Sequence, residues 1–286
     1  MASSLNLDMI RKKLQNLQTG EGRSKHLWKP EAGKNVVRIV PYQFNKENPF
    51  IELYFHYNIG KKKPLSLYTF GEPDPIQEFA EKLQETGNSE DWKLGKKIEP
   101  KLRVFVPIIV RGKEKEGVKF WGFGKEIYKA LMDIMLDADY GDISDLTSGR
   151  DITVTYDTPE QAGNTYGKIS VMAKPKETRA TEDKEVAQKI VHEQVDIYTI
   201  YTRPTYDELR SILEKWLNPE AEESVTDDKI AKAREAAQAD SETKSTPKKE
   251  VDDDDDDDDA EDEEEPTKDT PASTDNVEKT FDDLFD

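Results

Sequence analysis

Apolar and polar positions alternate in several short stretches in the middle of the chain, which is the pattern of half-buried β-strands. One such stretch is 51–59, where large apolar side chains occupy every second position. Others lie at 36–40, 102–110, 118–123, 151–156 and 168–173. The pattern predicts five or six short strands.

Three further stretches repeat apolar residues at three- and four-residue steps, which predicts helices. The first, 74–83, opens with a capping aspartate followed by a first-turn proline. The second covers 125–136, and the third, 205–217, opens with a capping box. Short strands with interposed helices predict an α+β fold, with an OB-fold (a five-stranded Greek-key barrel) as the leading candidate for its core.

The two ends of the chain have different patterns. Leu7, Ile10, Leu14 and Leu17 predict a short amphipathic helix, which is too short to be stable alone. This helix either packs on its own body or docks on a neighbouring molecule. We therefore divide the chain into an N-terminal arm (1–22), a core (23–217), a flexible linker (218–249) and an acidic tail (250–286).

Charge is distributed very unevenly along the 286 residues. The formal net charge is -19, from 42 Lys and Arg against 61 Asp and Glu. Residues 220–286 hold 28 acidic and 8 basic residues, whereas the remainder of the chain carries a net charge of only +1. A segment of this composition buries too little apolar surface to offset its ordering entropy. We expect a disordered, polyanionic tail on a near-neutral body.

Several classes of protein are disfavoured. The chain has no cysteine and only three scattered histidines, so disulfides and cysteine zinc sites are excluded. It has no apolar run long enough for a membrane span and no signal-peptide pattern. No phosphate-binding loop or nucleophile–base pair stands out. We expect a cytoplasmic protein that is not an enzyme and carries no cofactor.

Cations and aromatic residues share faces of the predicted strands. Unpaired bases stack on aromatic rings, at about 1–3 kcal/mol per base, while cations neutralise the phosphates. The alternative is that these rings fill a second small core and the charges are ordinary strand-edge charges. The candidate DNA contacts are Arg38, Tyr42, Tyr54, Lys61, Lys62, Lys63, Lys101, Arg103, Phe105, Arg111, Lys119, Trp121, Phe123 and Lys125.

Short motifs along the chain resemble, in the same order, those of the major single-stranded DNA-binding (helix-destabilising) proteins of T-even-type bacteriophages. They lie at 37–41, 48–56, 123–128, 193–196 and 206–209, and the acidic tail with its terminal Asp-Asp-Leu is also similar. On this resemblance alone, DNA contacts are carried over at Arg38, Trp121 and the 123–125 turn. The other candidates depend on the strand alternation.

The resemblance implies an OB-fold core and cooperative binding of single-stranded DNA in phage replication, recombination and repair, within the cytoplasm of the infected bacterium. The arm, with Arg11, Lys12 and Lys13, is then expected to mediate self-association along DNA. The tail is expected to recruit replication and recombination proteins through Phe281, Leu284 and Phe285.

One departure from the family concerns metal. The family holds zinc with one histidine and three cysteines, and here His56 alone falls on that pattern. We therefore predict no zinc. The alternative function is an acidic chaperone or nucleic-acid mimic, in which the tail binds a basic partner and the body only displays it.

Overall fold

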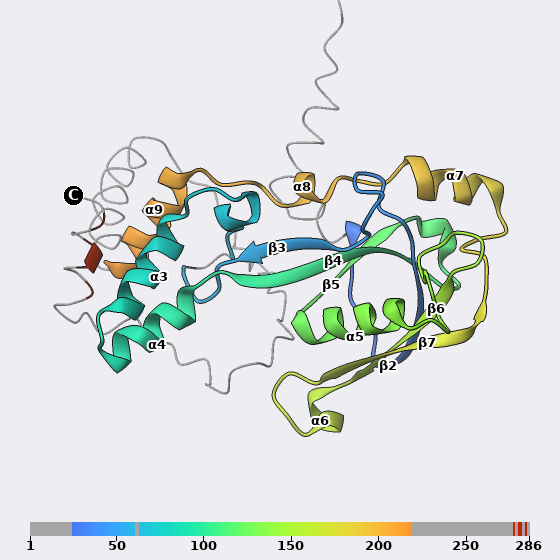
Figure 1. Cartoon of the computed structure of the whole chain (residues 1–286), viewed down its shortest axis with the longest axis horizontal. Helices are drawn as coiled ribbons and strands as arrows, with labels where there is room; N and C mark the ends of the chain where they lie inside the picture. Colours follow the sequence, from blue (N-terminus) through green and yellow to red (C-terminus); the bar gives the residue numbers. More distant parts are fainter. Residues whose placement is uncertain (1–24, 61–62, 219–276, 278–279, 282–283, 285–286) are drawn as a thin grey trace, which may run out of the picture. The chain divides into compact units, whose positions relative to one another are not determined.

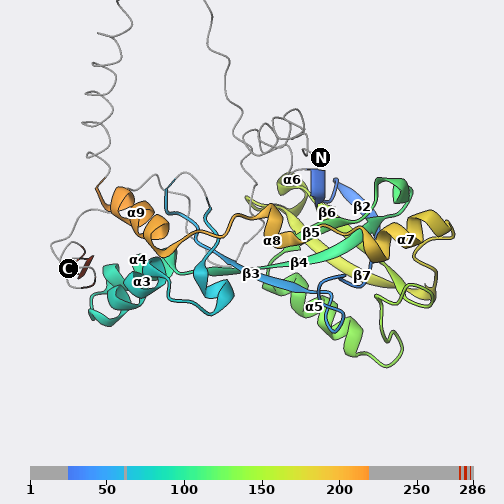
Figure 2. The ribbon, with the colours of Figure 1, turned by 90° about the horizontal axis from the view of Figure 1, so that it is seen from above.

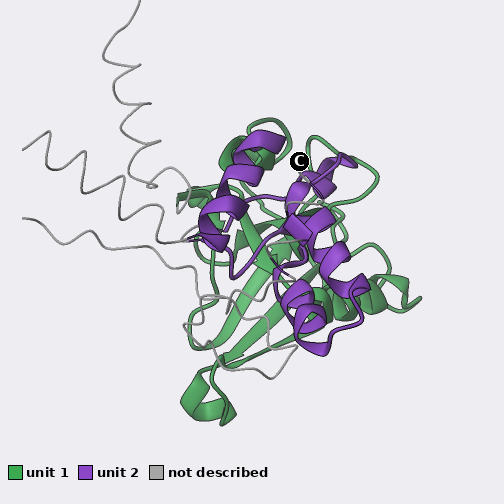
Figure 3. Cartoon of the chain, turned by 90° about the vertical axis from the view of Figure 1, so that its left-hand side faces the viewer, with its two compact units in different colours: residues 1–53, 102–203, 258–262 green, residues 54–101, 204–257, 263–286 purple. Residues whose placement is uncertain are grey.

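The computed structural model describes residues 25–60, 63–218, 277, 280, 281 and 284 (Figure 1). Strands and helices are mixed, as the α+β prediction requires. The chain divides into two compact units, which are described separately below (Figure 3). Unit 1 contains described residues 25–53 and 102–203, and unit 2 contains 54–60, 63–101, 204–218 and the four C-terminal residues.

The described strands form one seven-stranded sheet, against the five or six strands expected. Its order is β1-β5-β4-β2-β6-β7, with β3 paired to β4. β1 runs parallel to β5, and the pairs β2–β4, β2–β6, β4–β5 and β6–β7 are antiparallel. The strands are β1 (Leu27–Trp28), β2 (Gly33–Ile39), β3 (Ile51–Phe55), β4 (Lys101–Val110), β5 (Lys119–Phe123), β6 (Arg150–Asp157) and β7 (Lys168–Glu177).

The sheet of unit 1 is covered on both faces over its central strands. On one face, α5 (Lys125–Leu136) packs Leu131 into a cluster that includes Val37, Val106 and Trp121. On the other face, Val40 and Ile109 lie beneath Ala180 and the helix α7 (Lys184–His192). Two shorter helices, α6 (Pro159–Ala162) and α8 (Ile197–Ile200), and a 3-10 turn at Glu114–Glu116 also belong to this unit.

Unit 2 is built mainly from helices α3 (Pro75–Glu85), α4 (Ser89–Ile98) and α9 (Tyr206–Leu217), with a 3-10 turn at Leu67–Phe70 (Figure 2). The Asp74 cap and the Thr205–Glu208 capping box are both formed, which confirms those two helix starts. Helices α4, α6 and α8 and strand β1 were not among the predicted elements. Among the described helices of both units, none has the length and apolar character needed to cross a membrane.

Candidate nucleic-acid interface

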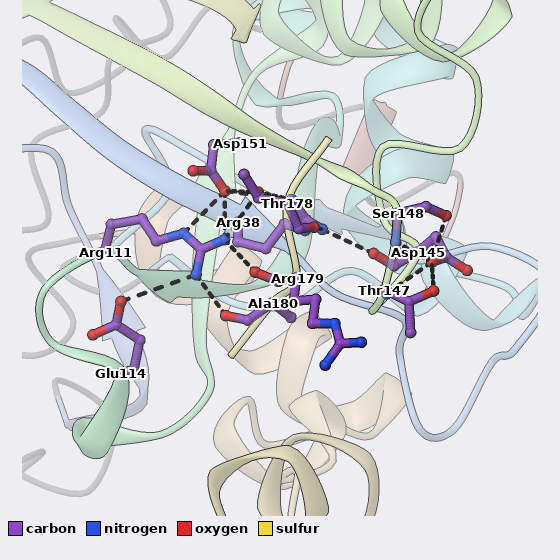
Figure 4. A network of polar contacts seen from close by, with 10 residues as sticks. All are labelled: Arg38, Arg111, Glu114, Asp145, Thr147, Ser148, Asp151, Thr178, Arg179 and Ala180. Atoms are coloured by element: carbon purple, nitrogen blue, oxygen red, sulfur yellow. Dashed lines mark hydrogen bonds and ion pairs between the residues drawn. The ribbon is translucent and has the colours of Figure 1, made fainter. Parts of the chain in front are cut away.

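Arg38 and Arg111, two of the predicted DNA contacts, converge on one carboxylate inside unit 1 (Figure 4). The Arg38 Nη1 donates to Asp151 Oδ1 at 3.3 Å, and the Arg111 Nε and Nη2 donate to the same oxygen at 2.9 and 2.7 Å. The backbone at Thr178 and Arg179 accepts further hydrogen bonds from the two guanidinium groups. Both guanidinium groups therefore form hydrogen bonds within the protein.

Arg38 is fully buried, so its predicted exposure on a DNA-binding face is wrong. Burial lowers the pKa of its guanidinium, while the charge of Asp151 opposes that shift. The Arg38 Nη2 also donates to the Asp145 carbonyl at 3.0 Å. Hydrogen bonds from Ser148 and Thr147 lower the pKa of the Asp145 carboxyl. These hydrogen bonds hold residues 178–180, which follow β7 in the sequence, against the sheet.

The aromatic residues expected on the DNA face are also in the core. Exposed fractions are 0% for Trp121, 2% for Phe123, 4% for Phe105 and 3% for Tyr42. The Trp121 ring centroid lies 5.8 Å from that of Trp28 and 4.7 Å from that of Phe123, both in edge-on contact. The expected exposure of these four rings is therefore wrong. Trp121 and Phe123 pair with Val106 and Val104, so they lie on the face that α5 covers. Phe105 lies on the opposite face, against Tyr201. The predicted DNA-binding faces of β4 and β5 are therefore opposite faces of the sheet.

The remaining candidates are dispersed. In unit 1, Lys119 pairs with Glu116, Arg103 donates to the Gly122 carbonyl at 3.1 Å, and Lys125 is exposed. Unit 2 holds Tyr54, Lys63 and Lys101, with the Lys63 ammonium 5.4 Å from the Tyr57 ring centroid. For these residues DNA contact stays a prediction. Lys61, Lys62, Phe285 and the arm residues Arg11, Lys12 and Lys13 lie outside the described residues.

A different part of the sheet is open to solvent. Along β7, exposed residues alternate with Ile169, Val171 and Ala173, which pack toward α5. Ser170 pairs with Thr155, which pairs in turn with Lys34 of β2, so these side chains share one face. We call this surface the lysine face; it consists of Lys34, Thr155, Lys168, Ser170, Met172 and Lys174.

The lysine face combines exposed lysines with an exposed apolar side chain. Met172 is 65% exposed, which is unusual for a large apolar side chain on a sheet. Lys168 and Lys174 are six residues apart on one strand, which corresponds to about 20 Å. Asp157 pairs with Lys168, so a carboxylate lies beside that lysine. Ammonium groups on an open sheet face attract phosphates in general, and Met172 presents an exposed apolar side chain beside these lysines.

Two exposed aromatic rings form a second feature of unit 1. Phe44 is 53% exposed and Tyr198 is 43% exposed. The Phe44 ring centroid lies 5.4 Å from that of the buried Tyr42. Tyr42 donates to Asp196 Oδ1 at 3.2 Å, and Asp196 caps the helix that carries Tyr198. Burial, aided by Asp196 and Tyr198, raises the pKa of the Tyr42 hydroxyl. We call Phe44 and Tyr198 the aromatic pair.

Two glutamines hold the backbone that carries the aromatic pair. The backbone N–H of Gln43 donates to Gln194 Oε1 at 3.0 Å, and the backbone N–H of Gln194 donates to Gln43 Oε1 at 3.1 Å. The Gln194 Nε2 also donates to the carbonyls of Pro41 and Ile190, each at 2.7 Å. Gln194 is buried, so these reciprocal bonds fix the two segments against each other.

Residues missed by the sequence reasoning carried a weak signal. The β7 alternation of Lys168, Ser170, Met172 and Lys174 is visible in the sequence, but it has no aromatic residue among its lysines. Phe44 lies in a loop and Tyr198 in a four-residue helix, so no repeat of apolar residues around them indicates which side chains are exposed. The Gln43–Gln194 pairing spans 151 residues and has no local signature.

The surroundings of His56 do not fit a zinc site. His56 is fully buried, with Nδ1 2.9 Å from the Ile98 carbonyl oxygen and Nε2 3.0 Å from Asp74 Oδ2. Both ring nitrogens are therefore engaged, and the chain has no cysteine to complete a tetrahedral set. Within the described residues, no three His, Asp or Glu side chains gather as a metal-ligating group.

Both carboxylate oxygens of Asp74 accept several hydrogen bonds. Its Oδ2 accepts from Ser66 Oγ at 2.6 Å and from the Leu67 amide at 2.9 Å, and its Oδ1 accepts from the first turn of α3. Burial opposes ionisation of this carboxyl, but the hydrogen bonds from His56 and Ser66 lower its pKa. The network joins three segments of unit 2.

An open sheet face with lysines and exposed aromatic rings is a combination that proteins binding single-stranded nucleic acid use. The chain belongs to the gp32 DNA-binding-protein-like family, which matches residues 31–218. This membership supports single-stranded DNA binding and confirms the resemblance noted in the sequence. No curated protein matches the chain.

Proposed function

We propose that the chain is a sequence-tolerant, cooperative single-stranded DNA-binding protein that acts, without catalysis, in phage replication, recombination and repair. The observation that carries this proposal is the family match over residues 31–218, which includes nearly all of the described core. In this role the protein coats exposed strands in the cytoplasm of an infected bacterium. The arm links neighbouring molecules, and the tail recruits replication proteins.

The proposed mechanism combines electrostatic attraction with stacking. Lys34, Lys168 and Lys174 attract the phosphate backbone, whereas Phe44 and Tyr198 offer exposed rings to unpaired bases. Stacking does not depend on base identity, because every base has a π-face. We further propose that an OB-type barrel lies within the seven-stranded sheet, since such barrels bind single strands on their sheet face.

The lysine face is tested by its contribution to salt dependence. In the full chain, Lys168→Gln with Lys174→Gln removes two cations, and Lys129→Gln with Lys184→Gln is a control of equal charge change. Each phosphate contact on a single strand contributes about 0.7 to the slope of log K against log salt concentration. We expect the lysine-face variant to lower the magnitude of this slope by about 1.4 for oligo-dT, and the control to leave it unchanged. Equal slopes in both variants would show that the DNA phosphates contact other residues.

The aromatic pair is tested by truncation. Phe44→Ala and Tyr198→Ala should each weaken oligo-dT binding by about 1–3 kcal/mol if a base stacks on the ring. Tyr166→Ala is the matched control, because that ring is 39% exposed but lies in the α6–β7 loop. If Tyr166→Ala weakened binding and the Phe44 and Tyr198 variants did not, the bases would stack in the loop between α6 and β7 instead.

A further inference from the structure

The described residues near the C-terminus lie on unit 2. Val277, Thr280, Phe281 and Leu284 are all helical, and Val277 is only 2% exposed. The dark red segment is drawn beside α3 and α9 in Figure 1. Val277 belongs to the same buried cluster as Phe79, Leu83 and Leu213, and Phe281 and Leu284 pack against that cluster. The end of an acidic tail thus completes an apolar core.

The contacts of this segment are specific side-chain contacts. The Phe281 ring centroid lies 6.1 Å from that of Phe79, with the rings 73° apart in an edge-on arrangement. Thr280 and Leu284 line a hollow with Lys82, Glu85 and Thr86 at the end of α3.

The spacing of these residues explains how so short a segment binds. Positions 277, 280, 281 and 284 are related as i, i+3, i+4 and i+7, so they occupy one face of a helix. Amphipathic helices dock into apolar grooves through anchors at this spacing. A separation of 59 residues, 218–276, lies between Leu217 and Val277. The segment therefore packs on unit 2 although it is far from α9 in the sequence.

We propose that the α3–α9 surface of unit 2 is a receptor for the chain's own C-terminal helix, and that docking there hides the apolar face of the tail. The occupant is residues 277–284 of the same chain. Release exposes Phe281 and Leu284, and a partner protein that takes this face competes with unit 2. The inference concerns the state of the tail and does not depend on DNA binding.

Docking within one chain is favoured by effective concentration. Tethered segments reach effective concentrations on the order of millimolar. If the free peptide binds the vacated surface with a Kd on the order of 100 μM, the tethered segment weakens binding of an added peptide by about tenfold. The surface remains occupied without a tight intrinsic affinity, and a partner can still displace the segment.

The test uses the full-length chain and a fluorescein-labelled peptide of residues 272–286. Phe281→Ala with Leu284→Ala vacates the surface while leaving the charge of the tail unchanged. The control is Glu278→Ala with Lys279→Ala, which truncates two side chains off the i, i+3, i+4, i+7 spacing and also conserves net charge. Fluorescence anisotropy measures peptide binding to each chain, and hydrogen exchange measures protection of α3 and of residues 277–284.

We expect the peptide to bind the vacated chain about tenfold more tightly than it binds the wild type or the control. Protection at 277–284 should be lost only in the vacated chain. Equal peptide affinity for all three chains would overturn the proposal. A wild-type chain that is dimeric by light scattering and dissociates on vacating the surface would also overturn it, because the occupant would then be a second copy.

Discussion

Replacing Trp121 by alanine separates a role in the core from a role in stacking. The indole is fully buried and makes edge-on contacts with Trp28 and Phe123 inside the main cluster of unit 1. Removing a buried tryptophan costs about 3–5 kcal/mol, from lost transfer free energy and the cavity left behind. Because total stabilities are about 5–15 kcal/mol, this loss is a large part of the whole.

Trp121→Phe provides a graded control. In the described part of the chain, the buried Trp121 Nε1 has no hydrogen-bond acceptor. Leaving a buried donor unpaired costs about 1–3 kcal/mol, so removing that donor offsets part of the volume lost with the smaller ring. We expect the phenylalanine variant to lose about 1–2 kcal/mol, clearly less than the alanine variant.

Urea denaturation followed by far-UV circular dichroism measures stability, and anisotropy with oligo-dT measures binding by the folded protein. The structure predicts a large fall in the free energy of unfolding for Trp121→Ala, with little change in DNA affinity at temperatures where the variant is folded. The reasoning would be refuted by an alanine variant of wild-type stability that binds oligo-dT about 1–3 kcal/mol more weakly, the signature of a stacked base.

Three further predictions follow from the buried polar networks. Asp151→Asn removes the charge shared by Arg38 and Arg111 and should cost about 3–5 kcal/mol in urea denaturation, since the buried Arg38 and the partly buried Arg111 lose their partner. The folded-state pKa of Asp74 is lowered from its ordinary 3.8, so its stabilisation is complete above that pH and is lost as pH falls through the folded pKa. Asp74→Asn should therefore flatten the acid limb of stability measured from pH 7 downward, and an unchanged limb would refute this assignment. Gln194→Ala should raise hydrogen exchange at residues 41–45 and weaken oligo-dT binding; unchanged exchange there would show that this glutamine does not hold the segment.

Local signals predicted the elements that have strong caps or a long, regular periodicity. The helix starts at Asp74 and Thr205 follow from capping chemistry that acts within four residues. The helix over 125–136 and the strand beginning near Lys101 match α5 and β4 because their periodicity is long and regular. Such features depend on neighbouring residues, so the sequence contains them directly.

Exposure could not be predicted in the same way. The alternation in β4 is consistent with one open face, yet Phe105 and Ile109 are buried because the segment containing α7 and α8 covers them. Pairing of Arg38 with Asp151 joins residues 113 positions apart, so nothing near either residue indicates it. Long-range packing decides which alternating face is available to DNA.

The most direct test of DNA binding is a titration of the full chain with labelled oligo-dT, a matched DNA duplex and polylysine, at salt concentrations of about 0.05 and 0.2 M. Proposed single-stranded DNA binding predicts tighter binding to oligo-dT than to duplex, with affinity falling as salt rises. Binding to polylysine together with no measurable binding to oligo-dT at either salt concentration would contradict it and identify an acidic mimic instead.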